Sequence, residues 1–196
     1  LLNKVMNIYN LGIDIGSTTL KWVLLDSHNN IIDKNYVRHC ANHAVVLLEE
    51  LQTLMQKIGP SMIRIAITGS VGMGYAERMG MYFIQEVIAE AKVVQTQYPM
   101  VRTLIDMGGE DSKMIFFSAN TSPDIRMNGN CAGGTGAFID QTAQLLGVAV
   151  EELDSLAEGY TIIYPIASRC GVFSKTDIQN LISQKVSKSD LVASVF

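Results

Sequence analysis

The sequence predicts an α/β protein made of two related domains, and two observations lead to this prediction. Short apolar stretches with strand character alternate with longer stretches in which apolar residues recur at helical spacing. In addition, one order of features occurs twice: an apolar strand, an aspartate, a glycine turn, a hydroxyl residue, a lysine and a second apolar strand. It is found around Asp14 and again around Asp106. A repeat with a period of about 90 residues indicates two copies of one structural unit.

Composition limits the kind of protein that this can be. The chain has 196 residues, of which 48% are hydrophobic, so it can bury a sizeable core. A net charge of −4 argues against a nucleic-acid-binding surface, and no apolar run approaches the roughly 18 residues of a membrane span. Three cysteines without regular spacing do not indicate a disulfide framework. We therefore expect a cytoplasmic protein without nucleic-acid or membrane partners.

The first half is expected to open as a meander of three strands, because turn-forming stretches separate three apolar ones. A helix that starts at Asn42 should end near Gly59-Pro60, since these residues stop helices. After a lead-in over residues 1–10, the expected elements are strands at 11–15, 20–26 and 31–38, the helix, a strand at 63–68, a flexible turn at 69–74, a helical stretch at 75–79 and a helix at 85–97.

The second half begins where Tyr98-Pro99 breaks the last of these helices, so we place the domain boundary between residues 97 and 98. Ser174 is a suitable N-cap for a helix at residues 175–184. Residue 196 falls inside an apolar helical stretch, so the second domain, 98–196, is expected to be truncated. Its other expected elements are strands at 101–106, 114–117 and 125–127, helices at 134–146 and 151–157, and an extended apolar stretch at 161–167.

Two acidic glycine turns are candidate phosphate sites. Asp14 ends a buried strand and is followed by Gly16, Ser17, Thr18 and Thr19. An aspartate in an apolar strand is costly without partners, whereas turn amides and hydroxyls hold phosphate and an aspartate holds hydrated Mg²⁺. The alternative is a polar hairpin turn. Because the turn after Asp106 repeats this plan, the pair could hold a polyphosphate and its metal from both sides.

The stretch 128–140 places Cys131 beside a run of glycines, just before an expected helix. Thiolate is the form of cysteine that binds metal, and glycines before a helix let amides approach a phosphate. The alternative is a glycine-rich turn with a small buried cysteine. Cys170 also precedes a helix, which strengthens the metal interpretation. Cys40 lacks this context and is expected to be a small buried residue, and His28, His39 and His43 are expected at the surface or in loops.

Together, these motifs resemble the ATP-dependent activators of 2-hydroxyacyl-CoA dehydratases and the related ATPase subunits of benzoyl-CoA reductase, within the acetate kinase, sugar kinase, Hsp70 and actin superfamily. The cysteine motifs are the specific part of the resemblance. It implies two RNase H-like, actin-like ATPase domains with mixed sheets flanked by helices, the second incomplete because the family's adenosine motif does not occur. The matching residues are 14–21 and 106–113 for the phosphate motifs, 67–72 for the connecting segment, and 128–140 and 170–173 for the cysteine motifs.

The resemblance implies an ATPase that transfers a low-potential electron from a [4Fe-4S] cluster to a 2-hydroxyacyl-CoA dehydratase-type partner. The cluster would bridge a homodimer, because a cluster takes four thiolates and each chain offers Cys131 and Cys170. ATP or ADP and Mg²⁺ would be the other cofactors, and a ferredoxin- or flavodoxin-type protein would donate the electron.

The resemblance also suggests individual roles. Mg²⁺ would lie near Asp14 and Asp106, and Asp106 or Glu110 would orient the attacking water. Many relatives have glutamine where this chain has Glu110. The expected nucleotide-binding residues are Asp14, Gly16, Ser17, Thr18, Thr19, Lys21, Gly108, Gly109, Lys113, Gly133, Gly134 and Thr135.

Three alternatives remain at the level of sequence. A zinc ion shared between two subunits would need the same number of cysteines. A metabolite kinase of the superfamily, such as an N-acetylglucosamine-type kinase, would need no cysteine pair. A non-catalytic module of a larger multi-domain protein would need no bound nucleotide.

Overall fold

The structure is a computed structural model that describes residues 7–118, 121–128 and 131–196. It divides into two compact units, Leu1–Arg102 and Thr103–Phe196. Residues 1–6 of the expected lead-in and residues 129–130 of the first cysteine motif lie outside the described part. The assignment of two actin-like domains with a boundary after residue 97 stays a prediction. Within the described part, no helix is long and apolar enough to cross a membrane.

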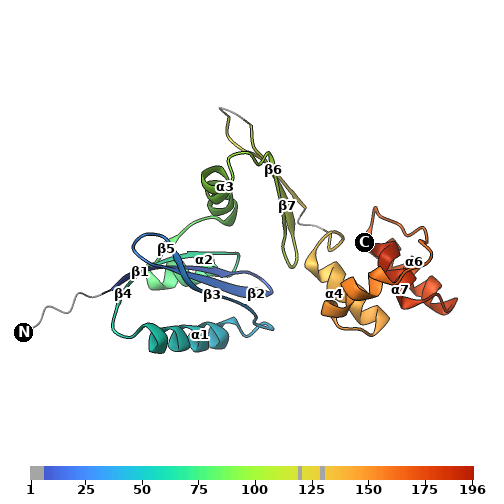
Figure 1. Ribbon diagram of the computed structural model, residues 1–196, viewed down its shortest axis with the longest axis horizontal. Helices are drawn as coiled ribbons and strands as arrows, with labels where there is room; N and C mark the ends of the chain where they lie inside the picture. The colour runs from blue at the N-terminus through green and yellow to red at the C-terminus, as the bar shows by residue number, and fades with distance from the viewer. Residues whose placement is uncertain (1–6, 119–120, 129–130) are drawn as a thin grey trace, which may run out of the picture. The chain divides into compact units, whose positions relative to one another are not determined.

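The first unit contains a five-stranded mixed sheet in the order β3-β2-β1-β4-β5. The first three strands pair antiparallel, whereas β1, β4 and β5 run parallel. Helix α1 lies along one face of the sheet (Figure 1), which confirms an α/β fold with a mixed sheet flanked by helices. The elements are β1 (Ile8–Ile15), β2 (Thr19–Leu25), β3 (Ile31–Arg38), α1 (His43–Ile58), β4 (Met62–Thr68), α2 (Gly72–Met79), β5 (Tyr82–Phe83) and α3 (Glu86–Gln97).

The core of the first unit determines to which face of the sheet the Asp14 side chain points. Leu11, Ile13 and Ile15 alternate along β1 and are buried against α1 residues such as Leu54. Because side chains of a strand point alternately to opposite faces, burial of these three turns Asp14 to the other face of the sheet. The apolar pattern of β1 thus fixes the orientation of its one acidic residue.

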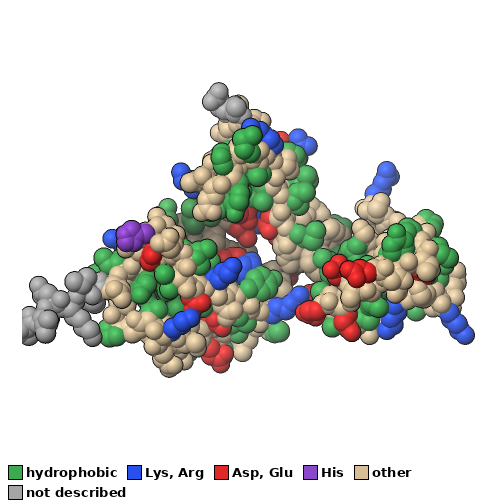
Figure 2. Space-filling model, in the orientation of Figure 1, with side chains coloured by type: hydrophobic (Ala, Val, Ile, Leu, Met, Phe, Trp, Pro, Cys, Tyr) green, Lys and Arg blue, Asp and Glu red, His purple; other side chains and the backbone are tan. Residues whose placement is uncertain are grey.

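The second unit joins a three-stranded antiparallel sheet, in the order β6-β7-β8, to a group of helices with its own apolar core. Ile178 and Leu191 are among the most buried side chains of that core. On the face shown in Figure 2, basic side chains are scattered among acidic ones instead of forming one patch. The elements are β6 (Thr103–Met107), β7 (Ser112–Phe116), β8 (Asp124–Asn128), α4 (Gly136–Leu146), the short 3₁₀ helix η1 (Val150–Glu152), α5 (Leu153–Glu158), α6 (Gly171–Ser183) and α7 (Lys188–Val195).

The prediction that Ser174 caps a helix starting at residue 175 is wrong. Helix α6 starts at Gly171, with Cys170 in an extended conformation as its N-cap. Ser174 lies inside the first turn, where its hydroxyl donates to the carbonyl oxygens of Ala167 and Cys170. A serine with a local backbone acceptor can lie within a helix as well as cap it, so composition alone misplaced the helix start. The correction brings Cys170 to the helix N-terminus itself.

Asp190 on α7 holds the segment between α5 and α6, which has no regular secondary structure. Its side chain is buried and accepts hydrogen bonds from the amides of Thr161, at 2.6 Å, and Ile162, at 2.9 Å. These bonds to the carboxylate lower the pKa of Asp190 to about 2. The lowered pKa means that folding favours the ionised form of this side chain.

The stability of the second unit is therefore expected to depend on Asp190 in acid. A folded-state pKa below the unfolded value, about 3.9, contributes stability above that pH and loses it as the pH falls toward 2. Asp190→Asn should lower the melting temperature by several degrees at pH 7 and flatten its fall between pH 4 and 2. The control is Asp154→Asn, at an exposed position on α5. Thermal melts that show the same acid dependence in both variants would contradict this role.

Candidate functional site

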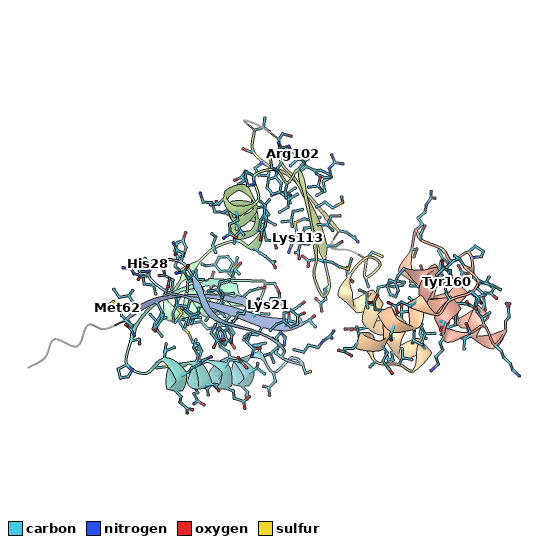
Figure 3. All side chains as sticks on the ribbon, viewed as in Figure 1. Lys21, His28, Met62, Arg102, Lys113 and Tyr160 are labelled. Carbon is cyan, nitrogen blue, oxygen red and sulfur yellow. The ribbon has the colours of Figure 1, made fainter. Side chains whose placement is uncertain are left out.

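The first phosphate turn joins β1 to β2 and contains an ion pair. Asp14 and Lys21 are cross-strand partners, and the Lys21 ammonium donates to Asp14 Oδ2 at 2.6 Å. Lys21 is labelled in Figure 3. Burial lowers the pKa of Lys21, but the hydrogen bond and the charge of Asp14 outweigh it, so the pKa lies above its ordinary value. Lys21 therefore carries a full positive charge at neutral pH beside the turn.

The second carboxylate oxygen of Asp14 is left without a partner. Asp14 Oδ1 is buried and accepts no hydrogen bond among the described residues, and the same holds for the hydroxyl of Thr68, its cross-strand neighbour on β4. A buried polar atom without a protein partner costs free energy unless a water molecule or an ion binds it. A carboxylate oxygen beside a hydroxyl suits a hydrated divalent cation. Asp14 therefore fits the magnesium role that the sequence predicted.

The amides of the same turn are available for an anion. The Gly16 amide donates to Thr19 O at 3.0 Å, while the carbonyl oxygens of Gly16 and Thr18 accept hydrogen bonds from His39. Neither the Ser17 nor the Thr18 amide donates to an acceptor in the described part of the chain. Successive unpaired amides in a turn form an anion-binding concavity. Ser17 is exposed, whereas Thr19 is only 8% exposed, so the hydroxyl of Thr19 is the less accessible.

Gly69, after β4, is the position where this turn tolerates no side chain. Its φ is +91°, and a Cβ atom there would lie 2.4 Å from Asp14 Oδ1 and from Ile15 O. Gly69→Ala is therefore expected to destabilise the first unit by about 2 kcal/mol or more and to weaken nucleotide binding by displacing Asp14. Urea unfolding and ATP titration measure the two effects.

Gly74→Ala is the matched control for Gly69→Ala. Gly74 lies in α2, and a Cβ atom there would meet nothing within 4 Å. Alanine is favoured over glycine within a helix by up to about 1 kcal/mol, so this variant should be neutral or slightly stabilising. Equal losses of stability in the two variants would contradict the steric account of Gly69.

The second phosphate turn, between β6 and β7, repeats the ion pair of the first. Asp106 and Lys113 are cross-strand partners, and their side chains meet at 3.0 Å, with Asp111 Oδ2 at 3.6 Å from the same ammonium. Aspartate and lysine are seven residues apart in both turns. Lys113 is only 4% exposed, so its charge is held inside the unit by two carboxylates. A direct contact of Lys113 with phosphate stays a prediction, as does the role of the exposed Glu110.

Backbone hydrogen bonds tie the second turn to helix α4. The amide of Gly136 donates to Gly108 O at 2.9 Å, and that of Ala137 donates to Gly109 O at 2.8 Å. Free amides at a helix N-terminus can bind an anion, but these two are already used by the turn. Any displacement of the Gly108-Gly109 peptide therefore moves the start of α4.

The glycine-rich segment before α4 is ordered by its own contacts. Thr135 is fully buried, and its hydroxyl donates to Ala132 O at 2.5 Å. Gly134 has a φ of +79°, and Gly133 donates its amide to Cys131 Sγ at 3.3 Å. Contact of residues 133–135 with nucleotide stays a prediction. The segment does connect the start of α4 to a thiol.

Cys131 and Cys170 line one cleft of the second unit, with a volume of about 580 Å³. The two loops that carry them touch through glycines: a Cβ atom on Gly133 would lie 3.3 Å from the Gly171 amide nitrogen, and one on Gly171 would lie 3.4 Å from that of Gly133. Cys131 is exposed and Cys170 partly so. Two accessible thiols, one on the N-cap residue of α6 and the other four residues before the N-cap of α4, line a site that fits a metal centre with thiolate ligands.

The prediction about the remaining thiol is wrong, because Cys40 is exposed instead of buried, with a φ of 46°. His39 lies in a loop, as predicted, but it is only 2% exposed because its ring is packed behind the first phosphate turn. Its neighbour in sequence, Cys40, is turned outward by this packing. His28 is exposed, as expected.

Comparisons with known proteins agree with the resemblance. The family model described as the BadF/BadG/BcrA/BcrD ATPase family matches residues 11–196. The (R)-2-hydroxyglutaryl-CoA dehydratase activating ATPase of Acidaminococcus fermentans is 32% identical over 193 residues, which is 97% of this chain and 74% of that protein.

Solved structures show the same similarity. Component A of the (R)-2-hydroxyglutaryl-CoA dehydratase from Acidaminococcus fermentans has a TM-score of 0.82 at 29% identity, over 96% of this chain and 73% of that one. The activator of the 2-hydroxyisocaproyl-CoA dehydratase from Clostridium difficile, with bound ADPNP, has a TM-score of 0.78 at 29% identity, over 95% of this chain and 70% of that one.

Proposed function

This chain belongs to the BadF/BadG/BcrA/BcrD ATPase family, and from that premise we propose that it is an ATP-hydrolysing activator that delivers a low-potential electron to a 2-hydroxyacyl-CoA dehydratase-type enzyme. One observation carries the proposal. The peptide carbonyls of the second phosphate turn bind the first amides of α4, five residues after Cys131. A turn of the predicted nucleotide site is thus hydrogen-bonded to the backbone that follows a predicted cluster ligand.

The two turns would bind the phosphates and Mg²⁺ of ATP and orient the attacking water. The Ser17 and Thr18 amides would bind phosphate oxygens, and Asp14 would hold Mg²⁺ through the oxygen that has no protein partner. Lys21, with its raised pKa, would stay charged and hold Asp14 in place. Asp106 or Glu110 would orient the attacking water. Catalysis of this kind consists mostly of positioning and electrostatic stabilisation.

The cysteine cleft would hold the redox group. Cys131 and Cys170 supply two thiolates, and the same pair from a second copy of the chain would complete the four that a [4Fe-4S] cluster takes. Such a cluster supplies one electron at low potential. The contact between Gly133 and Gly171 keeps the two cysteine loops close, and the Gly133 amide donates to Cys131 Sγ. These contacts orient the ligands from the protein side.

Coupling would pass from the second turn to Cys131 through α4. Gly108 and Gly109 would contact the nucleotide phosphates, and the amides of Gly136 and Ala137, which donate to the carbonyl oxygens of these two glycines, would transmit a change in those contacts to α4. If the start of α4 has two positions, reversing their ratio from 1:99 to 99:1 takes a difference of about 5.5 kcal/mol in nucleotide-binding free energy between them. At the redox group, each tenfold change in the electron-transfer equilibrium corresponds to a change of about 59 mV in the reduction potential.

The relatives support one of the proposed partners, because those from A. fermentans and C. difficile are activators of 2-hydroxyacyl-CoA dehydratases. We propose that this chain acts on an enzyme of that type as a homodimer, and that a ferredoxin- or flavodoxin-type protein reduces it.

Anaerobic reconstitution with iron and sulfide tests the proposal. The expected product is a brown dimer with about two iron atoms per chain, since one cluster of four irons is shared by two subunits. It should hydrolyse ATP and, once reduced, should activate a 2-hydroxyacyl-CoA dehydratase. Colourless protein that phosphorylates a sugar would favour a metabolite kinase instead. Zinc that is retained in place of iron would contradict the redox role.

A further inference from the structure

His39 is a buried titratable side chain of the first unit that the proposed mechanism does not use. It follows β3, is 2% exposed, and contacts the first phosphate turn twice. Its Nε2 lies 3.0 Å from Gly16 O, and its own amide donates to Thr18 O at 3.3 Å. One residue outside the turn therefore engages two of the turn's carbonyl oxygens.

The chemistry of the contact determines which atom carries hydrogen. A carbonyl oxygen only accepts, so His39 Nε2 must carry the hydrogen that it donates to Gly16. In a trans peptide, the carbonyl and the following amide point in opposite directions. Holding the Gly16 carbonyl toward the imidazole therefore turns the Ser17 amide away from the protein interior. That amide is one of the two without an acceptor in the described part of the chain.

The backbone around His39 is arranged to keep the imidazole there. Cys40 and Ala41 both have positive φ, 46° and 63°, which costs free energy in residues other than glycine. The Asn42 amide closes this turn onto His39 O at 2.7 Å. The imidazole also packs edge-on against His43, whose ring nitrogen is 2.8 Å from the Tyr75 hydroxyl. Strain of this kind persists where the surroundings enforce it, often at functional sites.

We propose that His39 is a positioning residue for the nucleotide phosphates: its Nε2–H group fixes the Gly16–Ser17 peptide so that the Ser17 amide faces the ligand. The proposal rests on the proposed nucleotide function of this turn. His39 itself touches no phosphate. It strengthens ATP binding because it fixes the conformation of the turn before ATP binds, so that less conformational entropy is lost on binding.

Three variants test the proposal by ATP binding and steady-state hydrolysis. Phenylalanine at position 39 fills the space but donates nothing, and glutamine places an amide nitrogen near the position of Nε2. His39→Phe should weaken ATP binding about tenfold, the loss of one well-placed hydrogen bond, with kcat changed less than about twofold. His39→Gln should recover most of the affinity. His28→Phe, at an exposed position in another turn, should leave both values unchanged.

The outcomes separate the proposal from its premise. Wild-type protein that binds ATP while His39→Phe binds it equally well would overturn the role of His39 alone. Wild-type protein that binds no ATP would overturn the nucleotide function and this inference with it. If His39→Phe does not fold, nitrogen NMR of the wild-type imidazole decides. Hydrogen on Nε2 and a shift of the Ser17 amide signal on adding ATP are expected. Hydrogen on Nδ1 with Nε2 bare would refute the proposal.

Discussion

Cys131→Ser and Cys170→Ser are each expected to reduce the iron content after anaerobic reconstitution from about two atoms per chain to near zero. One cluster with four thiolate ligands from two chains loses two ligands when either cysteine is replaced, because the substitution occurs in both subunits. A serine hydroxyl is a poor substitute, since it is not ionised at neutral pH. Iron analysis and visible absorption measure the loss.

Cys40→Ser is the matched control for both cysteine variants. Cys40 is exposed, like Cys131, but it lies in the first unit after β3, and it is not among the residues that line the cysteine cleft. Its replacement should leave iron content and colour unchanged. Iron loss that is equal in all three variants would mean that iron binds to thiols without a defined site. Iron retained in Cys131→Ser would remove Cys131 from the ligand set.

Asp14→Asn is expected to lower the kcat for ATP hydrolysis about 10²-fold, the usual scale for removing one preorganised electrostatic group. Asparagine keeps the size of the side chain but removes the charge that attracts Mg²⁺. It also removes the counter-charge that lies 2.6 Å from the Lys21 ammonium in the wild-type protein. Steady-state hydrolysis over a range of Mg²⁺ concentrations measures the effect, and added Mg²⁺ should recover part of the activity.

Asp33→Asn is the control for Asp14→Asn, because it removes a similar ion pair from the same sheet. Asp33 on β3 accepts from Lys57 at 2.7 Å, at an exposed position outside the turn. Exposed pairs contribute little to stability, so this variant should hydrolyse ATP at the wild-type rate. A comparable loss of activity in both variants would show that the effect of Asp14 arises from the fold and not from the metal.

Local patterns in the sequence predicted the main elements well. The alternating apolar residues of β1 and β2, and the glycine-proline stop after α1, act over a few residues and do not depend on distant contacts. The repeat around Asp14 and Asp106 was visible for the same reason. In the structure both occurrences are antiparallel hairpins with the same aspartate–lysine pair. Short β5 was missed, because two residues carry no periodicity.

Features that depend on tertiary contacts could not be predicted. The burial of His39 results from two carbonyls that lie more than 20 positions earlier in the chain, and a lone histidine in a turn gives no sign of them. Cys40 is exposed because of a left-handed backbone conformation, and the sequence does not predict this conformation because neither Cys40 nor Ala41 is a glycine or an asparagine. Likewise, α6 begins at Gly171 because Cys170 is extended, although Ser174 is the better N-cap by composition.

The central claim is that the second phosphate turn and the cysteine cleft are coupled through the start of α4. The reduction potential of the reconstituted protein, measured with and without a non-hydrolysable ATP analogue and Mg²⁺, tests it most directly. Because nucleotide contacts on Gly108 and Gly109 would move the α4 amides bound to them, the potential should shift by about 59 mV or more, a tenfold change in the electron-transfer equilibrium. An unchanged potential in protein that is saturated with nucleotide would contradict the claim.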